Sequence, residues 1–196
     1  MPHKKHTLLI LSAAFLFLLS CVGAATDTNP AVLRKRPKPQ ISVPALERRI
    51  HALINEERRK AGLPFLAWDD SLGAIARKHS KDMETRNYFD HYSPEGHDFL
   101  YRYREEGYRC GIRTGRTLHL GAENLALNNL YDSVTTVNGE AFYDWNSQEK
   151  LAETTVRGWM KSPGHRQNIL TPYWLHEGIG VVISPDGKVY ITQNFC

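Results

Sequence analysis

The chain has 196 residues, of which 41% are hydrophobic, 10% aromatic and 23% charged. This composition fits one globular domain with short extensions and excludes a wholly disordered chain. The formal net charge is +4, yet six of the 25 Lys and Arg residues and only one of the 21 acids lie in residues 1–40. Residues 41–196 therefore carry 19 basic and 20 acidic side chains. Such a balance argues against a nucleic-acid-binding domain, which needs a basic face.

Residues 1–25 have the three parts of a secretory signal peptide. Lys4 and Lys5 precede an apolar run over residues 8–19, and small residues follow over 20–25. Twelve helical residues are too short to cross a hydrocarbon core of roughly 30 Å. The sequence therefore predicts export, and a basic, Pro-rich linker over residues 26–44.

The three cysteines fit an exported protein. Leu18-Leu19-Ser20-Cys21 resembles a bacterial lipobox, which makes Cys21 a candidate for lipidation; the alternative is cleavage after Ala24 or Ala25. Either way Cys110 and Cys196 remain, and we expect them to form a disulfide in an oxidising compartment. Such a bridge would hold the C-terminus in place.

Hydrophobic periodicity predicts three long helices and a short one. The first starts at Ala45 and ends before Gly62; the second starts near residues 69–71. A short helix is expected over 99–106, and the last long one runs from Gln148 to a stop at residues 162–164. His79 lies on the apolar face of the second helix, so we interpret it as a buried, hydrogen-bonded core residue.

The C-terminal residues have the pattern of a β-hairpin. Segments 178–183 and 188–193 are β-branched and aromatic-rich, and Ser184-Pro185-Asp186-Gly187 has turn chemistry. Helices followed by this hairpin predict an α+β or three-layer domain. Residues 87–98 are expected to form a loop, whereas 108–119 and 128–146 have no pattern that assigns them.

Four side chains are candidates for chemistry: His91, Glu123, His165 and Glu177. Two imidazoles with one or two carboxylates can hold a divalent metal with open positions, or form a polar relay without metal. These residues span 86 positions, and no short-range metal motif links them. Their spacing alone does not bring them together.

Several segments, in this order, resemble the CAP superfamily, the SCP-like extracellular domains related to cysteine-rich secretory and plant pathogenesis-related proteins, and most closely its bacterial branch. The resembling segments are Asn55-Glu56-Glu57-Arg58, Leu66-Ala67-Trp68-Asp69, residues 87–96, Gly121-Ala122-Glu123-Asn124-Leu125-Ala126, residues 158–170 and Glu177-Gly178-Ile179-Gly180-Val181. Together they cover roughly residues 45–196.

The resemblance implies a three-layer α-β-α sandwich with a central antiparallel sheet, in an extracellular setting. It also implies a cleft of two histidines and two glutamates that holds a divalent metal such as zinc in some members. His91, Glu123 and His165 match three of these, with His91 and His165 as the metal ligands. The second glutamate is absent from Trp159-Met160-Lys161-Ser162, and Glu177 is expected to replace it.

Three functions fit these expectations. The first is an extracytoplasmic binding module for a lipid, a sterol-like molecule or a cell-envelope partner, reaching the membrane only through its leader or a lipid anchor. The second is a metal-dependent hydrolase or peptidase, with Glu123 or Glu177 as the base. The third is a structural or interaction domain with a vestigial cleft. The sequence contains no GxSxG nucleophile motif, and the binding module is the favoured interpretation.

Overall fold

The computed structural model describes residues 35–196. The expectations for the leader, for Cys21 and for the first part of the linker lie outside the described residues. Within them, no helix has both the length and the apolar character that crossing a membrane requires.

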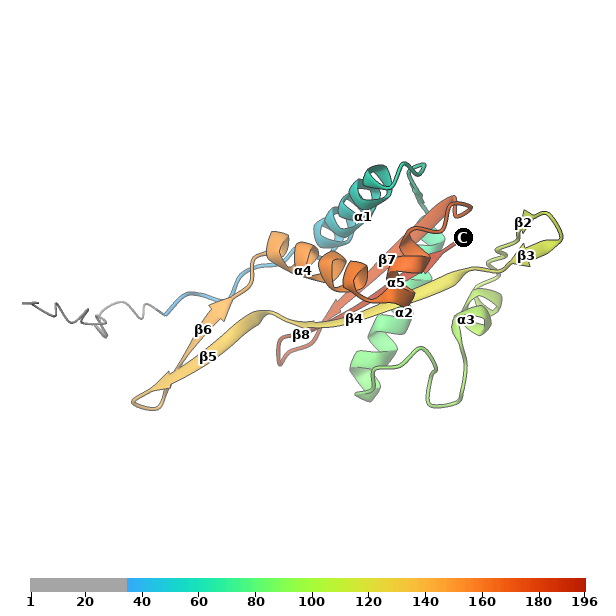
Figure 1. Ribbon diagram of the computed structural model, residues 1–196. Helices are drawn as coiled ribbons and strands as arrows, with labels where there is room; N and C mark the ends of the chain where they lie inside the picture. Colours follow the sequence, from blue (N-terminus) through green and yellow to red (C-terminus); the bar gives the residue numbers. More distant parts are fainter. Residues whose placement is uncertain (1–34) are drawn as a thin grey trace, which may run out of the picture. The chain divides into compact units, whose positions relative to one another are not determined.

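Five helices and eight strands make up the described part (Figure 1). The helices are α1 (Val43–Lys60), α2 (Asp70–Arg86), α3 (Phe99–Glu105), α4 (Gln148–Lys161) and α5 (Pro163–Ile169). The strands are β1 (Ala67–Trp68), β2 (Ile112–Thr114), β3 (Thr117–His119), β4 (Ala122–Asn129), β5 (Tyr131–Val137), β6 (Glu140–Trp145), β7 (His176–Ile183) and β8 (Lys188–Phe195).

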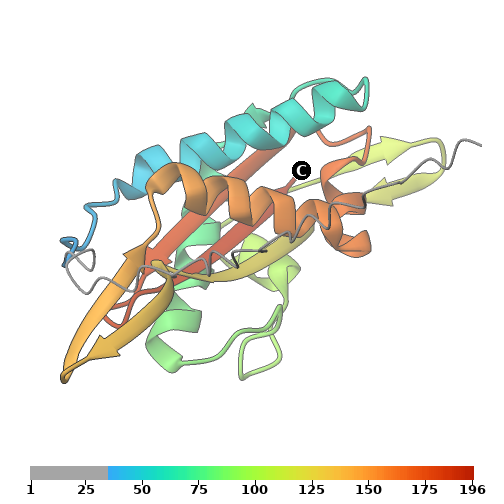
Figure 2. The same ribbon diagram turned by 60° about the vertical axis from the view of Figure 1, so that its left-hand side comes forward.

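The central sheet has the order β1-β7-β8-β4 and lies between two helical layers. Helices α1 and α4 cover one face, and α2 covers the other (Figures 1 and 2). The three-layer α-β-α fold is therefore confirmed. The sheet is mixed rather than purely antiparallel, because the two-residue strand β1 pairs with β7 in parallel.

β1 pairs with only the first two residues of β7, and a buried glutamate of α1 accepts a hydrogen bond from the strand edge beyond them. The backbone N–H of Val181 donates to the Glu47 carboxylate over 3.0 Å. Glu47 is buried on α1, and Arg77 of α2 donates to both of its oxygens over 2.8 and 2.7 Å. A buried carboxylate needs such donors to offset its lost hydration. The Glu47–Arg77 ion pair also connects α1 on one face of the sheet with α2 on the other, around the edge of the sheet.

Two glycines of β7 let α2 approach the sheet until the backbones touch. A Cβ at Gly178 would lie 2.0 Å from the backbone nitrogen of Gly73, and a Cβ at Gly180 would lie 2.0 Å from that of Arg77. No side chain fits at these distances. The Glu-Gly-x-Gly sequence of residues 177–180 therefore has a packing role.

We predict that Gly180→Ala destabilises the domain by about 3 kcal/mol or prevents folding, because overpacking forces α2 away from the strand. Thermal or urea unfolding measures the effect. Gly158→Ala is the matched control: it lies on α4 with nothing within 4 Å of its added Cβ. That change should be neutral or stabilising by about 0.5 kcal/mol. Equal stability of the two variants would contradict this account of the contact.

The C-terminus is held by the cysteine pair expected from the sequence. Cys110 and Cys196 are joined, with their Cα atoms 5.5 Å apart. Cys196 directly follows β8, and its neighbours in a small apolar cluster are Leu72, Ile75 and Tyr103. The bridge therefore connects the central sheet to the segment after α3.

We predict that Cys110→Ser/Cys196→Ser lowers the free energy of unfolding by roughly 4 kcal/mol, because the bridge closes an 86-residue loop in the unfolded chain. Urea unfolding of the exported protein, with and without the substitutions, measures the difference. Two titratable thiols in the exported parent protein would show that the bridge does not form there.

The segments that had no predicted structure form two hairpins. Residues 112–119 contain β2 and β3, and residues 131–145 contain β5 and β6. Aromatic contacts join the two strands of the second hairpin: Tyr131 of β5 packs edge to face on Tyr143 of β6, with ring centroids 5.1 Å apart. The predicted stop at Ser162-Pro163-Gly164 is confirmed as the end of α4, but Pro163 also begins α5. Proline suits the first turn of a helix because its missing N–H is not needed there.

Candidate functional site

The loop after α2 carries His91 and is fixed by contacts to the helix. Asn87 ends α2 in the left-handed conformation, with φ of 53°. The predicted core position of His79 is confirmed: it is 1% exposed, and its Nε2 donates to the carbonyl of Asp90 over 3.0 Å. This bond holds the residue immediately before His91.

His91 pairs with a buried carboxylate on the edge strand β4. Its Nδ1 donates to Oε1 of Glu123 over 2.9 Å. The Glu123 side chain is 1% exposed, whereas that of His91 is 46% exposed. A carboxylate only accepts hydrogen bonds, so the bond places a proton on Nδ1. In the neutral ring, Nε2 is then the nitrogen with a free lone pair.

Arg102 completes this pair and is a site residue that the sequence analysis missed. From α3, its Nη2 donates to Oε2 of Glu123 over 2.7 Å and to the carbonyl of His91 over 3.1 Å. Its Nη1 donates to the carbonyl of His97 over 3.0 Å. The Arg102 guanidinium thus neutralises the charge of the buried Glu123 carboxylate. It also holds the loop through two of its carbonyl groups, those of His91 and His97. Its only sequence signal is an arginine on a short helix, which is not specific.

His165 lies in the first turn of α5, which packs on β4. The Nδ2 of Asn124 donates to the carbonyl of His165 over 3.2 Å, and the Nδ2 of Asn168 donates to that of Glu123 over 3.2 Å. Burial lowers the pKa of His165, and His91 lowers it further when its own ring is protonated. His165 therefore favours the neutral form, and its backbone is bonded to Asn124, the residue that follows Glu123 on β4.

Glu177 does not join these residues. In the sheet register Glu123 and Gly178 both pair with Asn194, whereas Glu177 pairs with the next residue, Phe195. Successive side chains point to opposite faces, so Glu123 lies on the α2 face and Glu177 on the α1 face. The expected replacement of the missing glutamate by Glu177 therefore fails on geometry.

Glu177 instead forms a separate buried cluster. It is fully buried and accepts hydrogen bonds from Nδ1 of His51 and from Nε2 of Gln193, each over 2.5 Å. The Nδ2 of Asn55 contacts the other ring nitrogen of His51 at 3.3 Å. His51 was not identified from the sequence, because it adjoins an apolar stripe and belongs to no pattern.

The side chains fit a divalent metal only in part. Both oxygens of Glu123 are engaged, by His91 and by Arg102, so this carboxylate orients an imidazole and is not free to ligate. In residues 35–196, no group of three or more His, Cys, Asp and Glu side chains is arranged to hold a metal ion. The candidate ligands are thus the two imidazoles of His91 and His165.

We predict that the domain loses stability as the pH falls below about 6.5, the ordinary histidine pKa. Burial lowers the pKa of His79 and of His165. Below that pH the unfolded chain binds protons that the folded chain resists, so acid favours unfolding. Urea unfolding at about pH 7.5 and about pH 5 measures the slope. His79→Gln, which keeps an amide donor, should reduce the slope; an unchanged slope would exclude His79 as a source.

Comparison with known proteins identifies the family. The model of the cysteine-rich secretory protein family, CAP, matches residues 51–195. The protein YkwD of Bacillus subtilis is 34% identical over 157 residues, which are 79% of this chain and 48% of that protein. The membrane protein YlbC of the same organism is 34% identical over 76% of this chain and 34% of its own length. The chain thus spans half or less of the curated relatives it matches.

Solved structures agree with this assignment. An extracellular protein of Bacillus anthracis that contains an SCP domain is 27% identical, with a TM-score of 0.56, over 85% of this chain and 49% of that one. An outer surface protein of Borrelia burgdorferi has a TM-score of 0.59 over 81% of this chain and 97% of its own. At 16% identity, that likeness concerns the fold alone. With its α-β-α sandwich and a family match over residues 51–195, the chain belongs to the cysteine-rich secretory protein (CAP) family.

Proposed function

We propose that this protein is an extracytoplasmic binding module whose binding site centres on His91. The observation that supports the proposal is the difference in solvent exposure between the two side chains of the His91–Glu123 pair. The carboxylate is buried and bound on both oxygens, while the imidazole is half-exposed with its second nitrogen free. A ring held in this way presents one fixed acceptor to an incoming group. The leader expected over residues 1–25 and the extracellular relative from B. anthracis support a location outside the cytoplasm.

Within this proposal, His91 and His165 bind one divalent metal such as zinc. Neutral imidazole nitrogens are good zinc ligands, and the lowered pKa of His165 keeps it neutral. Glu123 stands behind His91 as the carboxylate that sets its tautomer and orientation. A bound metal would supply a positive charge and Lewis acidity, and water or the bound partner would complete its ligand shell.

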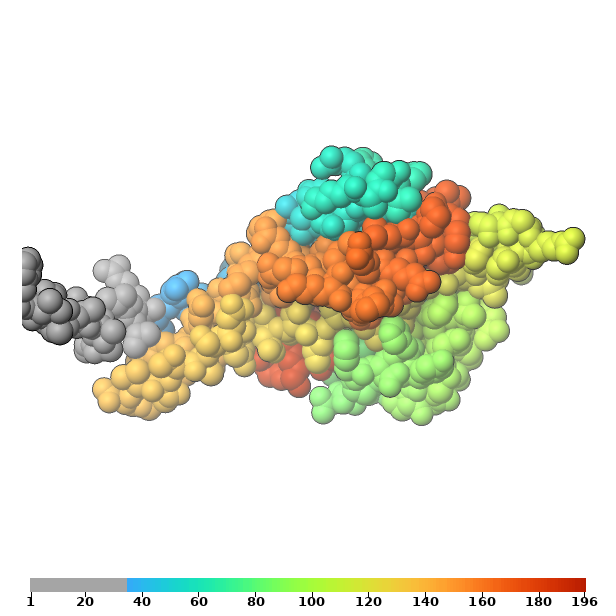
Figure 3. Space-filling view, viewed as in Figure 1, coloured from blue at the N-terminus to red at the C-terminus, as the bar shows by residue number. Residues whose placement is uncertain are grey.

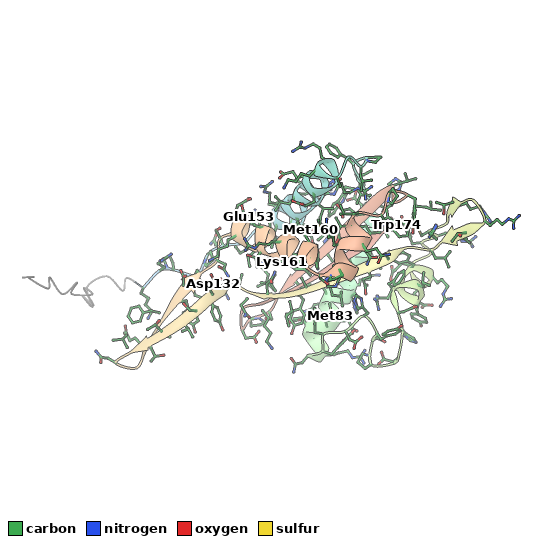
Figure 4. The ribbon with its side chains drawn as sticks, in the orientation of Figure 1. Met83, Asp132, Glu153, Met160, Lys161 and Trp174 are labelled. Atoms are coloured by element: carbon green, nitrogen blue, oxygen red, sulfur yellow. A yellow bond between two sulfur atoms is a disulfide. The ribbon has the colours of Figure 1, made fainter. Side chains whose placement is uncertain are left out.

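An apolar partner such as a lipid or a sterol-like molecule fits a different part of the domain. A groove of about 360 Å³ lies between α1 and α4. Leu53, Val156 and Met160 give it apolar surface, and charged residues surround it, including Glu153 and Lys161 (Figure 4). Ligand sites commonly combine apolar lining with a few polar groups in this way. This groove is on the α1 face, so its occupant would not touch His91.

Metal-dependent hydrolysis is the second candidate function. The His91–Glu123 pair has the form of an oriented general base, with a carboxylate on one ring nitrogen. In the described part of the chain, however, no hydroxyl or thiol side chain hydrogen-bonds to His91, so a nucleophile would have to be water. The geometry favours binding because it positions one acceptor without a nucleophile beside it.

We predict that the exported protein binds zinc and that His91→Ala and His165→Ala each abolish binding in isothermal titration calorimetry. Glu123→Gln should weaken binding by about 10- to 100-fold, as loss of an orienting carboxylate does. Affinity should fall as the pH drops through about 6.5, because protonated imidazole cannot ligate.

The control is His79→Gln, which should lower stability and leave zinc binding in place. If His91→Ala and His165→Ala bind zinc as the parent does, the metal proposal fails and a hydrogen-bonded relay remains. Zinc-dependent cleavage of a peptide library that is lost in both variants would instead establish the hydrolase.

A further inference from the structure

Four arginines gather on one surface of the domain without carboxylate partners. Arg104 lies in the last turn of α3, Arg109 follows that helix, and Arg113 and Arg116 lie on the β2–β3 hairpin; we name these four the arginine face. All four are exposed, and in the described part of the chain none of them forms a salt bridge, whereas most other arginines there do. Unpaired guanidinium groups on one surface favour an anionic partner.

The same surface also exposes apolar side chains. Arg113 pairs directly with Leu118 across the hairpin, so both side chains leave from the same side. Leu118 is 46% exposed and Leu120 is 43% exposed. Leu120 follows β3 and lines the same pocket as Arg104 and Arg109. The arginine face is therefore amphipathic.

The side of the β2–β3 hairpin that faces the domain holds the hairpin in position through packing contacts. Ile112 and His119 pair with each other and point away from Arg113 and Leu118. His119 stacks on Tyr173 with ring centroids 3.9 Å apart, and Ile112 packs against the core. The outer side is left without a partner within the described part of the domain. Figure 3 shows the hairpin standing out from the neighbouring surface, where a flat partner can reach it.

A shallow pocket adjoins the hairpin and has the same amphipathic character. Its volume is about 300 Å³. Leu100 and Leu120 line it together with Arg104 and Arg109, and the bridged Cys110 lies in its wall. Apolar surface next to guanidinium groups matches the boundary between lipid head groups and acyl chains, where both kinds of side chain are satisfied.

We propose that the arginine face docks the domain on an anionic lipid bilayer. The guanidinium groups bind lipid phosphates, and Leu118 and Leu120 enter the interface beside them. The leucines favour a bilayer over a soluble polyanion, which would need only the charges. The surface is independent of the zinc site and the α1–α4 groove; it rests only on the export expected from residues 1–25.

Vesicle co-sedimentation of the exported protein tests the proposal. Every version carries Cys21→Ser, so that no acyl group at that position adds membrane affinity. Vesicles of phosphatidylcholine with and without phosphatidylglycerol should show binding only to the anionic lipid, weakened by salt. Arg113→Gln/Arg116→Gln should weaken partitioning about 25-fold, since each arginine contributes roughly fivefold.

The matched control removes two exposed arginines from α1 and α4. Arg59→Gln/Arg157→Gln changes the net charge by the same amount. It should alter partitioning by less than about twofold, because in the proposed orientation these charges lie more than a Debye length, about 10 Å, from the bilayer. An equal loss in both pairs would mean that overall charge, not this surface, drives binding, and would overturn the proposal.

Two further measurements separate the remaining outcomes. Leu118→Ser should weaken vesicle binding by about tenfold and leave binding to soluble polyphosphate unchanged. Polyphosphate binding that matches vesicle binding, with no effect of Leu118→Ser, would make the surface a polyanion site and overturn the bilayer proposal. Zinc binding by the arginine variants reports separately on the proposed function, and their cooperative thermal unfolding shows that they fold.

Discussion

The close contact between α2 and β7 is the constraint on which the rest of the domain depends. Because Gly178 and Gly180 have no side chains, the helix lies directly on the strand. Ser80 then reaches across to donate to the carbonyl of Gly180 over 2.9 Å. This bond fixes the C-terminal half of α2, and the loop that follows the helix brings His91 to Glu123. A helix held farther away by a methyl group would carry the loop, and with it the imidazole, away from its carboxylate.

The sheet buries one carboxylate on each face, and each is stabilised differently. Glu123 has a full ionic partner in Arg102 as well as a histidine. Glu177 has hydrogen bonds from His51 and Gln193, a neutral amide. A buried carboxylate without several donors would be too costly to keep. What distinguishes the two is access to the paired histidine: the His51 side chain is 18% exposed and the His91 side chain 46%. Of these two pairs, the one on the α2 face therefore presents its histidine as a candidate site.

The helices, the C-terminal hairpin and the cysteine pair could be predicted because each depends on local pattern or simple chemistry. The β2–β3 and β5–β6 hairpins could not be predicted, because their strands are mostly exposed and so lack an apolar alternation, and because β2 and β3 have only three residues each. The separation of Glu123 from Glu177 depends on sheet register, which no spacing along the chain encodes. The role of Arg102 could not be predicted for a related reason. Its three hydrogen-bond acceptors come together around one guanidinium only in the folded chain.

The hydrogen bonds around Glu123 support the proposed binding role more than the alternative of catalysis. Arg102 engages one oxygen and His91 the other, so the carboxylate is committed to holding the loop and the ring. The groups that remain available to a ligand are Nε2 of His91 and the imidazole of His165, which favours its neutral form. Two nitrogen donors are fewer than the three protein ligands of a typical catalytic zinc site. In the proposed metal site, water or a bound partner would therefore have to supply the remaining ligands.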